Sequence, residues 1–256
     1  MTPRRAESQG GSRVGLPPTV SVIVSTYNRP QFLDRALASI HKQTYADFDV
    51  WVVDDCTPGD ANEGVLKKWH ELHWERGIPF YAARLEWNSG YQCVPKNAGI
   101  FYSTGDFIAY LDDDNTWEPT HLETMMRHMT PDVDMVYCGI RYDNRTDNAS
   151  LPTGERPAPP WDPVALFQQN YIDTSAMIHS RGSAMMLSQE AYNVWDESLR
   201  RFADWNLVAR FARAGLRAAP VPGHFINYVW HGDNLQLTRK PAGVYVQNLA
   251  DMKAAV

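Results

Sequence analysis

A short apolar run that ends in three consecutive carboxylates constrains the fold of this chain more than any other feature. Residues 107–111 read Phe-Ile-Ala-Tyr-Leu and lead directly into Asp112, Asp113, Asp114 and Asn115. The length of the run and its Ile, Tyr and Phe residues predict a buried strand. Three adjacent acids cannot belong to an apolar core, so the strand ends where they begin.

Two interpretations of the acidic triplet are open. Side chains alternate along a strand, so Asp112 and Asp114 point one way and Asp113 points the other. Crowded carboxylates repel one another unless a positive group lies between them, and a hard divalent cation such as Mg²⁺ fits that need. The alternative is an acidic turn before the next helix, with Asn115 or Thr116 as the N-cap.

Size and composition narrow the class of protein. The 256 residues suffice for one large domain or two small ones, and 44% hydrophobic and 21% charged residues are typical of globular proteins. A net charge of −6 argues against a nucleic-acid partner, and no apolar run approaches the roughly 18 residues of a membrane span. The N-terminus lacks the apolar stretch of a secretory signal, and three widely spaced cysteines predict neither a disulfide framework nor a zinc site. We expect a cytoplasmic protein. The sequence leaves open whether it contacts the inner face of a membrane peripherally and whether it forms a homodimer.

The first half of the sequence alternates strands and helices. Strands are predicted at 20–25, 48–55, 80–85 and 106–111, and helices at 30–40, 61–76 and 93–104. Polar residues cluster after the strands. This pattern is typical of a doubly wound α/β sheet, in which ligands bind at the carboxyl ends of the strands.

The second half is less regular. Helices are predicted at 118–129 and 204–214, strands at 133–141 and 225–230, a long surface loop at 144–163 and a short apolar run at 184–187. Composition and pattern predict a flexible tail at 1–18, one domain at 19–240 and a C-terminal helix at 241–256.

Five stretches, in matching order and spacing, resemble the family 2 glycosyltransferases, which have the GT-A fold. They are residues 20–30 (VSVIVSTYNRP), 52–55 (VVDD), 96–97 (KN), 105–114 (GDFIAYLDDD) and 117–119 (WEP). The resemblance covers roughly residues 18–235. It implies a Rossmann-like, mostly parallel central sheet flanked by helices, with a nucleotide-sugar-binding half at 19–117 and an irregular acceptor-binding half at 118–240.

The resemblance implies a donor site made from the first half. Ser25, Tyr27 and Arg29 match positions that hold the nucleotide base and ribose, and Asp55 matches an acid that accepts a hydrogen bond from a pyrimidine N–H. Lys96 stands where the family often has an arginine near the donor phosphates, so it keeps the charge but loses the bidentate fork. The structural alternatives are loop packing for Tyr27, a turn for Asp55 and a solvated helix lysine at position 96.

The resemblance also assigns the acidic triplet. Asp114 would be the direct ligand of Mn²⁺ or Mg²⁺, and Asp112 and Asp113 would contact the ribose and metal-bound water. The ion would help a nucleoside diphosphate to leave. His231 matches a region that supplies a further metal or phosphate contact in some enzymes of this fold; the alternative is a surface-loop histidine.

The catalytic base of the family is an acid at the start of a helix in the second half. The candidates are Asp173, Asp196, Glu197 and Asp204. The segment 202–207 resembles the family segment, so we assign Asp204, whose charged form a helix N-terminus favours; the alternative is a simple helix cap. Many members carry Glu-Asp at this point, whereas Ala203 precedes the aspartate here. Asp173, Thr174 and Trp205 are expected on the acceptor side, although Trp205 and Trp161 could equally be core residues.

These assignments imply a metal-dependent, inverting glycosyltransferase of the hexosyltransferase type. The donor would be a nucleotide sugar, with UDP favoured because Asp55 suits a pyrimidine, and the acceptor could be a glycan, a lipid-linked sugar, a protein or a small molecule. One alternative is a sugar-phosphate nucleotidyltransferase, but the loop at 25–30 has no glycine to cradle a triphosphate. Another is a catalytically inactive nucleotide-sugar-binding protein.

Overall fold

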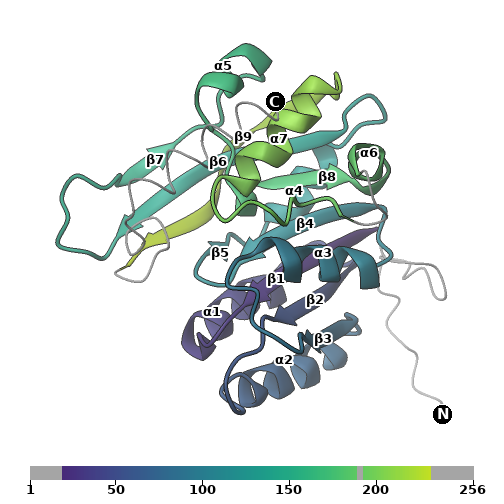
Figure 1. Cartoon of the computed structure of the whole chain (residues 1–256), viewed down its shortest axis with the longest axis vertical. Coiled ribbons are helices and arrows are strands. Elements are labelled where there is room, and N and C mark those ends of the chain that lie inside the picture. The colour runs from purple at the N-terminus through teal and green to yellow at the C-terminus, as the bar shows by residue number, and fades with distance from the viewer. Residues whose placement is uncertain (1–18, 189–192, 232–256) are drawn as a thin grey trace, which may run out of the picture.

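The computed structural model describes residues 19–188 and 193–231, which form one mixed sheet flanked by helices (Figure 1). The strands are β1 (Val20–Thr26), β2 (Phe48–Asp54), β3 (Phe80–Arg84), β4 (Phe107–Asp112), β5 (Thr116–Trp117), β6 (Met135–Asn144), β7 (Gly154–Arg156), β8 (Met177–Ser180) and β9 (Ala218–Trp230). The helices are α1 (Pro30–His41), α2 (Glu63–Glu75), α3 (Cys93–Tyr102), α4 (His121–His128), α5 (Pro163–Gln168), α6 (Arg181–Leu187), α7 (Ala203–Arg213) and a short 3₁₀ turn, η1 (Thr174–Ala176). The sheet has the order β3-β2-β1-β4-β8-β6-β9-β5, with β7 paired to β6.

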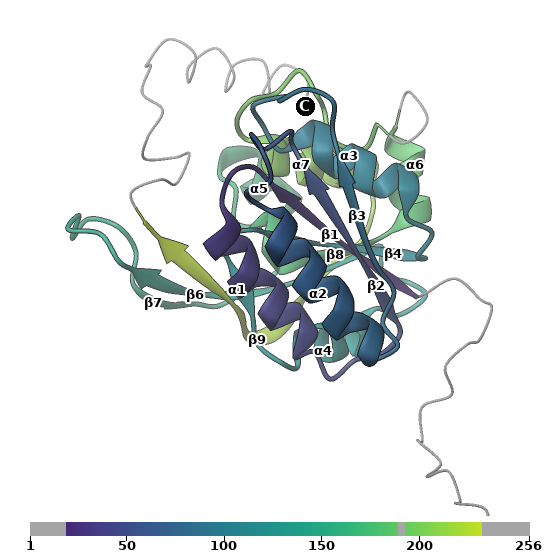
Figure 2. The same ribbon diagram turned by 90° about the horizontal axis from the view of Figure 1, so that it is seen from below.

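The first four strands form the parallel half of the sheet. β1 lies between β2 and β4, and β3 adds to β2, all in parallel register. The β-branched run of β1 is buried on both faces. Val22 and Val24 pack in the same core cluster as α1, whereas Ile23 packs with α3 residues on the other face. Figure 2 shows α1 and α2 side by side on one face of these strands and α3 on the other. The α/β prediction is therefore confirmed, and the predicted elements of this half all exist.

A glycine lets α3 lie close to β1. A Cβ atom on Gly99 would sit 2.6 Å from the Cγ2 atom of Ile23, closer than real Cβ atoms approach. The missing side chain brings the helix down onto the strand. This contact fixes the height of α3, and with it the height of Lys96, above the sheet.

The second half extends the sheet with a different pairing pattern. β8 joins β4 to β6 and is antiparallel to both, whereas β6 and β9 are parallel. β6, β7 and β9 project together as an arm at one side of the molecule (Figure 1). The expectation of a mostly parallel sheet thus holds for β1 to β4, and the irregular half is mixed.

Two predictions in the second half were wrong. β9 begins at Ala218 rather than 225, because Pro222 and Gly223 are accommodated where the β6–β9 register shifts around Gly139. The predicted loop at 144–163 contains β7, which exists through its pairing with β6. The apolar run at 184–187 is the end of α6. The predicted tail at 1–18 and the C-terminal helix at 241–256 lie outside the described residues.

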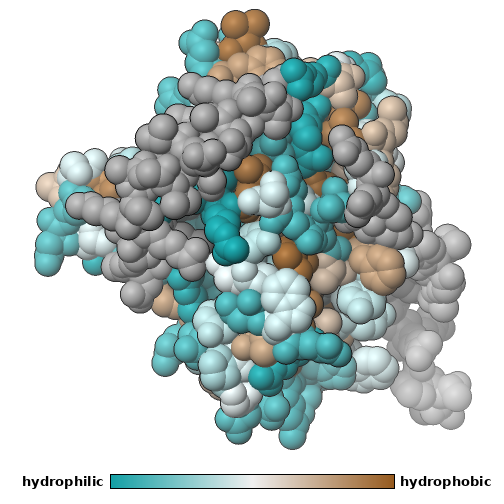
Figure 3. Space-filling model, viewed as in Figure 1, coloured by the Kyte–Doolittle hydropathy of each residue, from teal (hydrophilic) through white to brown (hydrophobic). Residues whose placement is uncertain are grey.

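The surface of the described residues is mixed in character. Figure 3 shows hydrophilic and hydrophobic residues intermingled over the face seen in Figure 1. In the described ranges, no helix has both the length and the apolar character needed to cross a bilayer.

Candidate active site

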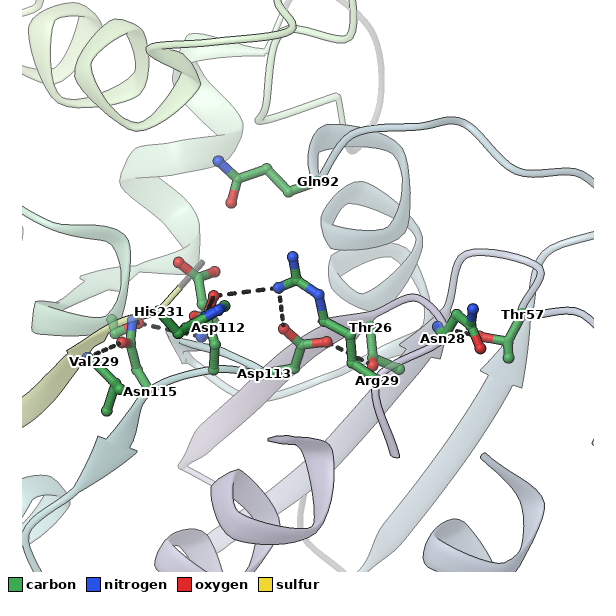
Figure 4. Close-up of polar contacts among 12 residues, drawn as sticks. Thr26, Asn28, Arg29, Thr57, Gln92, Asp112, Asp113, Asn115, Val229 and His231 are labelled. Carbon is green, nitrogen blue, oxygen red and sulfur yellow. Dashed lines mark hydrogen bonds and ion pairs between the residues drawn. The ribbon is translucent and has the colours of Figure 1, made fainter. Parts of the chain in front are cut away.

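The acidic triplet lies where β4 ends, next to the loop that follows the adjacent parallel strand β1 (Figure 4). The carboxyl ends of neighbouring parallel strands meet at one edge of the sheet, so residues far apart in sequence converge there. Arg29 comes from the β1–α1 loop and His231 follows the end of β9. Both reach the triplet.

Asp113 is the most enclosed acid of the triplet. The Thr26 hydroxyl donates a 2.7 Å hydrogen bond to Asp113 Oδ2, and Arg29 Nη1 lies 3.4 Å from Asp113 Oδ1. Arg29 Nη1 is also 3.2 Å from Asp114 Oδ2, so one guanidinium nitrogen bridges two carboxylates. Burial, reinforced by the charge of Asp114, raises the pKa of Asp113 to about 7 despite the opposing effect of Arg29. The positive group that the crowded acids require is therefore Arg29 in this structure.

Asp114 and His231 form the part of the site that best fits a divalent cation. His231 Nε2 lies 3.2 Å from Asp114 Oδ2, and the imidazole packs on the Phe32 ring with centroids 4.4 Å apart. Asn115 Oδ1 accepts a 3.4 Å hydrogen bond from the backbone N–H of Val229, which holds the end of β9 against this loop.

The donor set is one that Mn²⁺ or Mg²⁺ accepts. Within 19–188 and 193–231, no group of three His, Cys, Asp or Glu side chains is already arranged around one point. The carboxylate and imidazole instead suit an open site, in which phosphate oxygens and water complete the coordination.

Asp112 faces away from Arg29 and pairs with a buried lysine. Lys96 Nζ lies 2.8 Å from Asp112 Oδ1 and also donates to Gln92 Oε1. The backbone N–H of Asp112 donates to the Ser175 hydroxyl at 3.2 Å. Asp112 and Asp113 therefore have different partners, as predicted, but the predicted pairing of Asp112 with Asp114 was wrong. Asp114 shares Arg29 with Asp113, because β4 ends at Asp112 and the strand alternation does not continue beyond it.

Asp173 and Asp204 lie near this pair. Burial, with added repulsion from Asp112 and Asp204, raises the pKa of Asp173 to about 7. Burial also raises the pKa of Asp204, which Lys96 lowers and Asp112 raises further. Asn170 Nδ2 donates a 3.0 Å hydrogen bond to Asp204 Oδ2. Asp112, Asp173 and Asp204, which are distant in sequence, therefore form one cluster around Lys96, which we call the Lys96 cluster.

The start of α7 places Asp204 in this cluster. Phe202 precedes the helix and has a left-handed backbone with φ of 59°. A bulky residue seldom adopts that conformation, which is found mainly where surrounding structure enforces it. The turn directs the first residues of α7 toward the sheet edge. Phe202 provides no side-chain cap for α7. A hydrogen bond between the Trp205 backbone and the Asp204 carboxylate lowers the pKa of Asp204, so this carboxylate contacts the helix start, as the capping alternative implies.

The expected nucleotide end of the site lies beyond Arg29. Tyr27 is 41% exposed and Ser25 is half-buried at the end of β1. The backbone N–H of Asn28, which has φ of 52°, donates to the Thr57 hydroxyl at 2.8 Å and ties the first loop to the second. Tyr27 is therefore accessible to a ligand.

The Asp55 carboxylate accepts hydrogen bonds from other groups of the protein. Its oxygens accept hydrogen bonds from the backbone N–H groups of Ser89 at 2.9 Å and Gly90 at 3.1 Å, and from Asn88 Nδ2 at 3.1 Å. Asp54 holds the same turn, because its Oδ1 accepts from the Thr57 N–H at 2.8 Å. The predicted contact of Asp55 with a pyrimidine stays a prediction. A bound nucleobase would have to hydrogen-bond to a carboxylate that already accepts from Ser89, Gly90 and Asn88.

The other candidate bases serve local structure. Asp196 Oδ1 accepts from the backbone N–H and hydroxyl of Ser198, and Glu197 Oε1 accepts from Asn97 Nδ2 at 2.9 Å. Asp173 and Asp204, in contrast, lie close enough to Asp112 for its charge to raise their pKa values.

The residues predicted on the acceptor side differ in how far a ligand could reach them. Asp173 belongs to the Lys96 cluster, and its Oδ1 accepts from the Ser175 N–H at 2.8 Å. Thr174 is buried, and Trp205 is only 6% exposed, with its indole N–H donating to the Leu166 carbonyl. Trp161 packs against the same core as Trp205. Trp205 thus acts as a core residue in this structure.

Sequence reasoning missed three residues of this site. Thr26, Gln92 and Asn170 each hydrogen-bond to Lys96 or to an acid of the site. Thr26 lies beside recognised residues and could have been found from its place at the end of β1. The other two carry no local signal, because their roles depend on tertiary contacts. Ser175 was expected beside Asp173 on the acceptor side, and its hydroxyl accepts from the Asp112 N–H.

The comparisons with known proteins agree with this geometry. The model of the family described as Glycosyl transferase family 2 matches residues 21–195. Over 203 residues the chain is 24% identical to Protein CgeD of Bacillus subtilis (strain 168), covering 73% of this chain and 43% of CgeD. Over 223 residues it is 26% identical to the uncharacterized glycosyltransferase YwdF of the same strain, covering 84% of this chain and 76% of YwdF. The chain thus spans less than half the length of CgeD.

Solved structures share the fold. S. aureus TarS 1–349 in complex with UDP-GlcNAc matches with a TM-score of 0.69 and 17% identity over 92% of this chain and 65% of that chain. The mannosyltransferase PcManGT from Pyrobaculum calidifontis, in complex with GDP-Man and Mn²⁺, matches with a TM-score of 0.61 and 18% identity. The match covers 84% of this chain and 57% of the PcManGT chain. These likenesses confirm the GT-A fold. The family model covers more than half of the sequence, and this chain therefore belongs to glycosyltransferase family 2.

Proposed function

We propose that this protein transfers a sugar from a nucleotide sugar to an acceptor hydroxyl by direct, inverting displacement. The observation that carries the proposal is the meeting of two groups of acids at one sheet edge. Asp112, Asp113 and Asp114 follow β4, whereas Asp173 and Asp204 come from the second half. One group suits a leaving diphosphate with its cation, and the other suits proton transfer.

The donor would bind along the β1–α1 loop. Tyr27 would stack on the base, Ser25 and Asp55 would contact the nucleoside, and Arg29 would turn from the carboxylates toward phosphate. UDP is favoured, and the UDP-GlcNAc complex of TarS supports that choice, although the PcManGT complex contains GDP-Man.

A divalent cation would be held by Asp114 and His231, with Asp112 and Asp113 toward ribose and metal-bound water. Such an ion neutralises charge on a departing diphosphate. The Mn²⁺ in the PcManGT complex supports this role. Arg29 already shows that the carboxylates of Asp113 and Asp114 can share one positive group.

Asp204 would accept the proton of the attacking hydroxyl. Its carboxylate has one oxygen bonded to Asn170, which orients it, and burial raises its pKa toward the range of a useful base. Attack from the side opposite the diphosphate needs a single base and inverts the anomeric configuration. Asp173 borders the same space and would contact the acceptor.

The test is a panel of UDP-, dTDP- and GDP-sugars, scored for metal-dependent release of the nucleoside diphosphate. We expect release with a UDP-sugar and Mn²⁺ or Mg²⁺, and none after chelation. Thermal shift with each nucleoside diphosphate provides an independent reading of binding. If no diphosphate raises the melting temperature and none is released, the proposed donor site is wrong.

A further inference from the structure

A polar cleft opens beside the acidic triplet, between α1 and the arm formed by β6, β7 and β9. Figure 2 shows α1 and the arm on the same side of the molecule. The cleft has a volume of about 680 Å³, and small-molecule sites typically have about 300 to 1,000 Å³. Asp114 is part of its wall, so the cleft borders the proposed cation site. We call it the arm cleft.

Three arginines are the cations of the cleft wall. They are Arg35 of α1, Arg141 of β6 and Arg145, which follows β6. Arg141 is engaged within the protein, because its Nη1 lies 2.9 Å from Glu118 Oε1 and its Nη2 lies 3.0 Å from Glu155 Oε1. Its role is therefore to hold the arm together, and the other two arginines are more available to a ligand.

The carboxylates of the cleft wall already have positive partners. Asp143 Oδ2 lies 2.7 Å from Arg145 Nε, and Asp114 Oδ2 lies 3.2 Å from Arg29 Nη1. Glu155 is the third wall acid, and it pairs with the arm as described above. Arg145 uses its Nε for its pair with Asp143, so its terminal nitrogens can still donate to a ligand.

Arg35 is held in a different way from the other two arginines. Its guanidinium carbon lies 4.7 Å from the centroid of the Phe32 ring, and the side chain is exposed. Such a contact fixes the guanidinium without using its five N–H donors. The His231 imidazole packs on the same ring, so Arg35 is one side chain away from the pair of His231 and Asp114. A guanidinium held in this way is suited to bind a phosphate or a carboxylate through two hydrogen bonds.

The arm cleft lies at the end of the donor site that is farther from the proposed nucleoside contacts. In Figure 4 the contact between Asn28 and Thr57 lies on one side of Arg29, and His231 and the end of β9 lie on the other. Most of the cleft wall comes from the arm, which belongs to the half that the family resemblance assigns to the acceptor. A group bound in the cleft is therefore on the acceptor side of the proposed cation site.

We propose that the arm cleft binds an anionic group of the acceptor, a phosphate or a carboxylate, through Arg35 and Arg145. The inference rests on the proposed function and names the class of acceptor, which is a sugar or glycan that carries negative charge. The two guanidinium groups would donate several hydrogen bonds to the oxygens of that anion. A neutral sugar would forgo these charged contacts, so the cleft should prefer a charged sugar to its neutral counterpart.

The test uses three probes that share one type of sugar ring and differ in charge, namely glucose 6-phosphate, glucuronate and glucose. Each is titrated into the full chain by isothermal calorimetry with UDP and Mg²⁺ at saturating concentration, so that the proposed diphosphate site is already filled. We expect one or both charged probes to bind at least about tenfold more tightly than glucose. This preference should fade as the salt concentration rises from about 50 mM to about 500 mM. The charged probe that binds identifies the anion as phosphate or carboxylate, and charged probes that bind no more tightly than glucose overturn the proposal.

Arg35→Gln is the decisive variant, and Arg127→Gln is its matched control. Arg127 is also an exposed arginine, but it pairs with Glu123 within α4 and does not line the arm cleft. Arg35→Gln should weaken the charged probe by about tenfold and leave the Kd for UDP unchanged, whereas Arg127→Gln should change neither. Equal weakening in the two variants would show that overall charge governs binding and would contradict the proposal. A loss of UDP affinity as large as the loss of probe affinity would assign Arg35 to the donor diphosphate and also overturn it.

A second variant keeps the inference independent of the folding of the first. If Arg35→Gln does not fold, Arg145→Gln decides, because it should weaken the charged probe by at least about threefold and unchanged binding overturns the proposal. The inference and the proposed function also fail in different ways. UDP that binds while neither charged sugar does contradicts the inference alone. A protein that binds no nucleoside diphosphate contradicts the proposed function, and the probe titration without UDP then still tests the cleft.

Discussion

The acids on the two sides of the site are held in different ways. Asp112, Asp113 and Asp114 are consecutive, follow one buried strand, and have strong partners in Lys96 and Arg29. Asp173 and Asp204 come from separate turns of the mixed half, where the Asp173 carboxylate accepts from the Ser175 N–H and the Asp204 carboxylate accepts from Asn170. The donor-side acids are thus held by ion pairs, whereas the acceptor-side acids are held by hydrogen bonds.

This difference fits the two proposed tasks, which are binding of the leaving diphosphate with its cation on the donor side and proton transfer on the acceptor side. A group that binds a cation and a diphosphate acts in its ionised form, and a neighbouring positive charge favours that form, as Arg29 does against the burial of Asp113. A base must take up a proton and so benefits from a pKa raised by burial. Ser175 connects the two sides, because its hydroxyl accepts from the Asp112 N–H and its own N–H donates to Asp173.

The largest effect is expected at Asp114. Asp114→Ala removes the proposed metal carboxylate, so we expect donor turnover to fall by about 10³-fold. Mn²⁺ binding, followed by electron paramagnetic resonance with UDP present, should weaken in parallel. Asp132→Asn, an exposed acid far from the triplet in sequence, should change neither. Unaltered Mn²⁺ binding in Asp114→Ala would remove Asp114 from the metal site.

Substitution of Ser175 tests the physical link between the donor side and the acceptor side of the site. Its hydroxyl accepts hydrogen bonds from the Asp112 N–H and from Asn115 Nδ2, and it is buried. Ser175→Ala leaves these donors unpaired, so the free energy of unfolding should fall by about 2 kcal/mol. Urea unfolding measures the loss, and Ser198→Ala on the surface should cost much less. Equal losses would show that the link has no special energetic role.

The smallest expected effect concerns burial of the acceptor-side acids. Because the pKa of Asp173 is raised to about 7 in the folded protein, its charged form opposes folding above the ordinary pKa of an aspartate. Asp173→Asn should therefore raise the free energy of unfolding at pH 8 by on the order of 1 kcal/mol. The gain should shrink as the pH falls from 7 toward 4. Urea unfolding at pH 8, 6.5 and 5 measures it, and a gain independent of pH would show that burial does not govern Asp173.

Local sequence was enough to predict the parallel half. β1 is a β-branched run whose alternate residues face two different helix layers, and β4 is an apolar run that stops at its acids. Both signals are contained in a few neighbouring residues. The second part of β9 was predicted as a strand at 225–230, but its first part, 218–224, was not. Pro and Gly residues there are typical of loops, and pairing with β6 makes the segment a strand.

The candidate site shows the same contrast between local and tertiary signals. The triplet and Asp204 were proposed from short motifs and His231 from its region, and the structure brings His231 to Asp114. The burial of Lys96 could not be predicted, because a lysine in a first helical turn normally reaches solvent. Its enclosure depends on Trp195, which lies about a hundred positions along the chain, in a loop that Asn97 fastens to α3.

The central claim is that donor-side and acceptor-side acids perform separate steps. Its most direct test is Asp204→Asn, assayed for UDP binding and for sugar transfer in the same preparation, with Asp196→Asn as the control. We predict that transfer falls by about 10³-fold while the Kd for UDP with Mn²⁺ stays unchanged, since removing a general base leaves the leaving-group site intact. Transfer that continues at the wild-type rate, or a loss of UDP binding that matches the loss of transfer, would contradict the account.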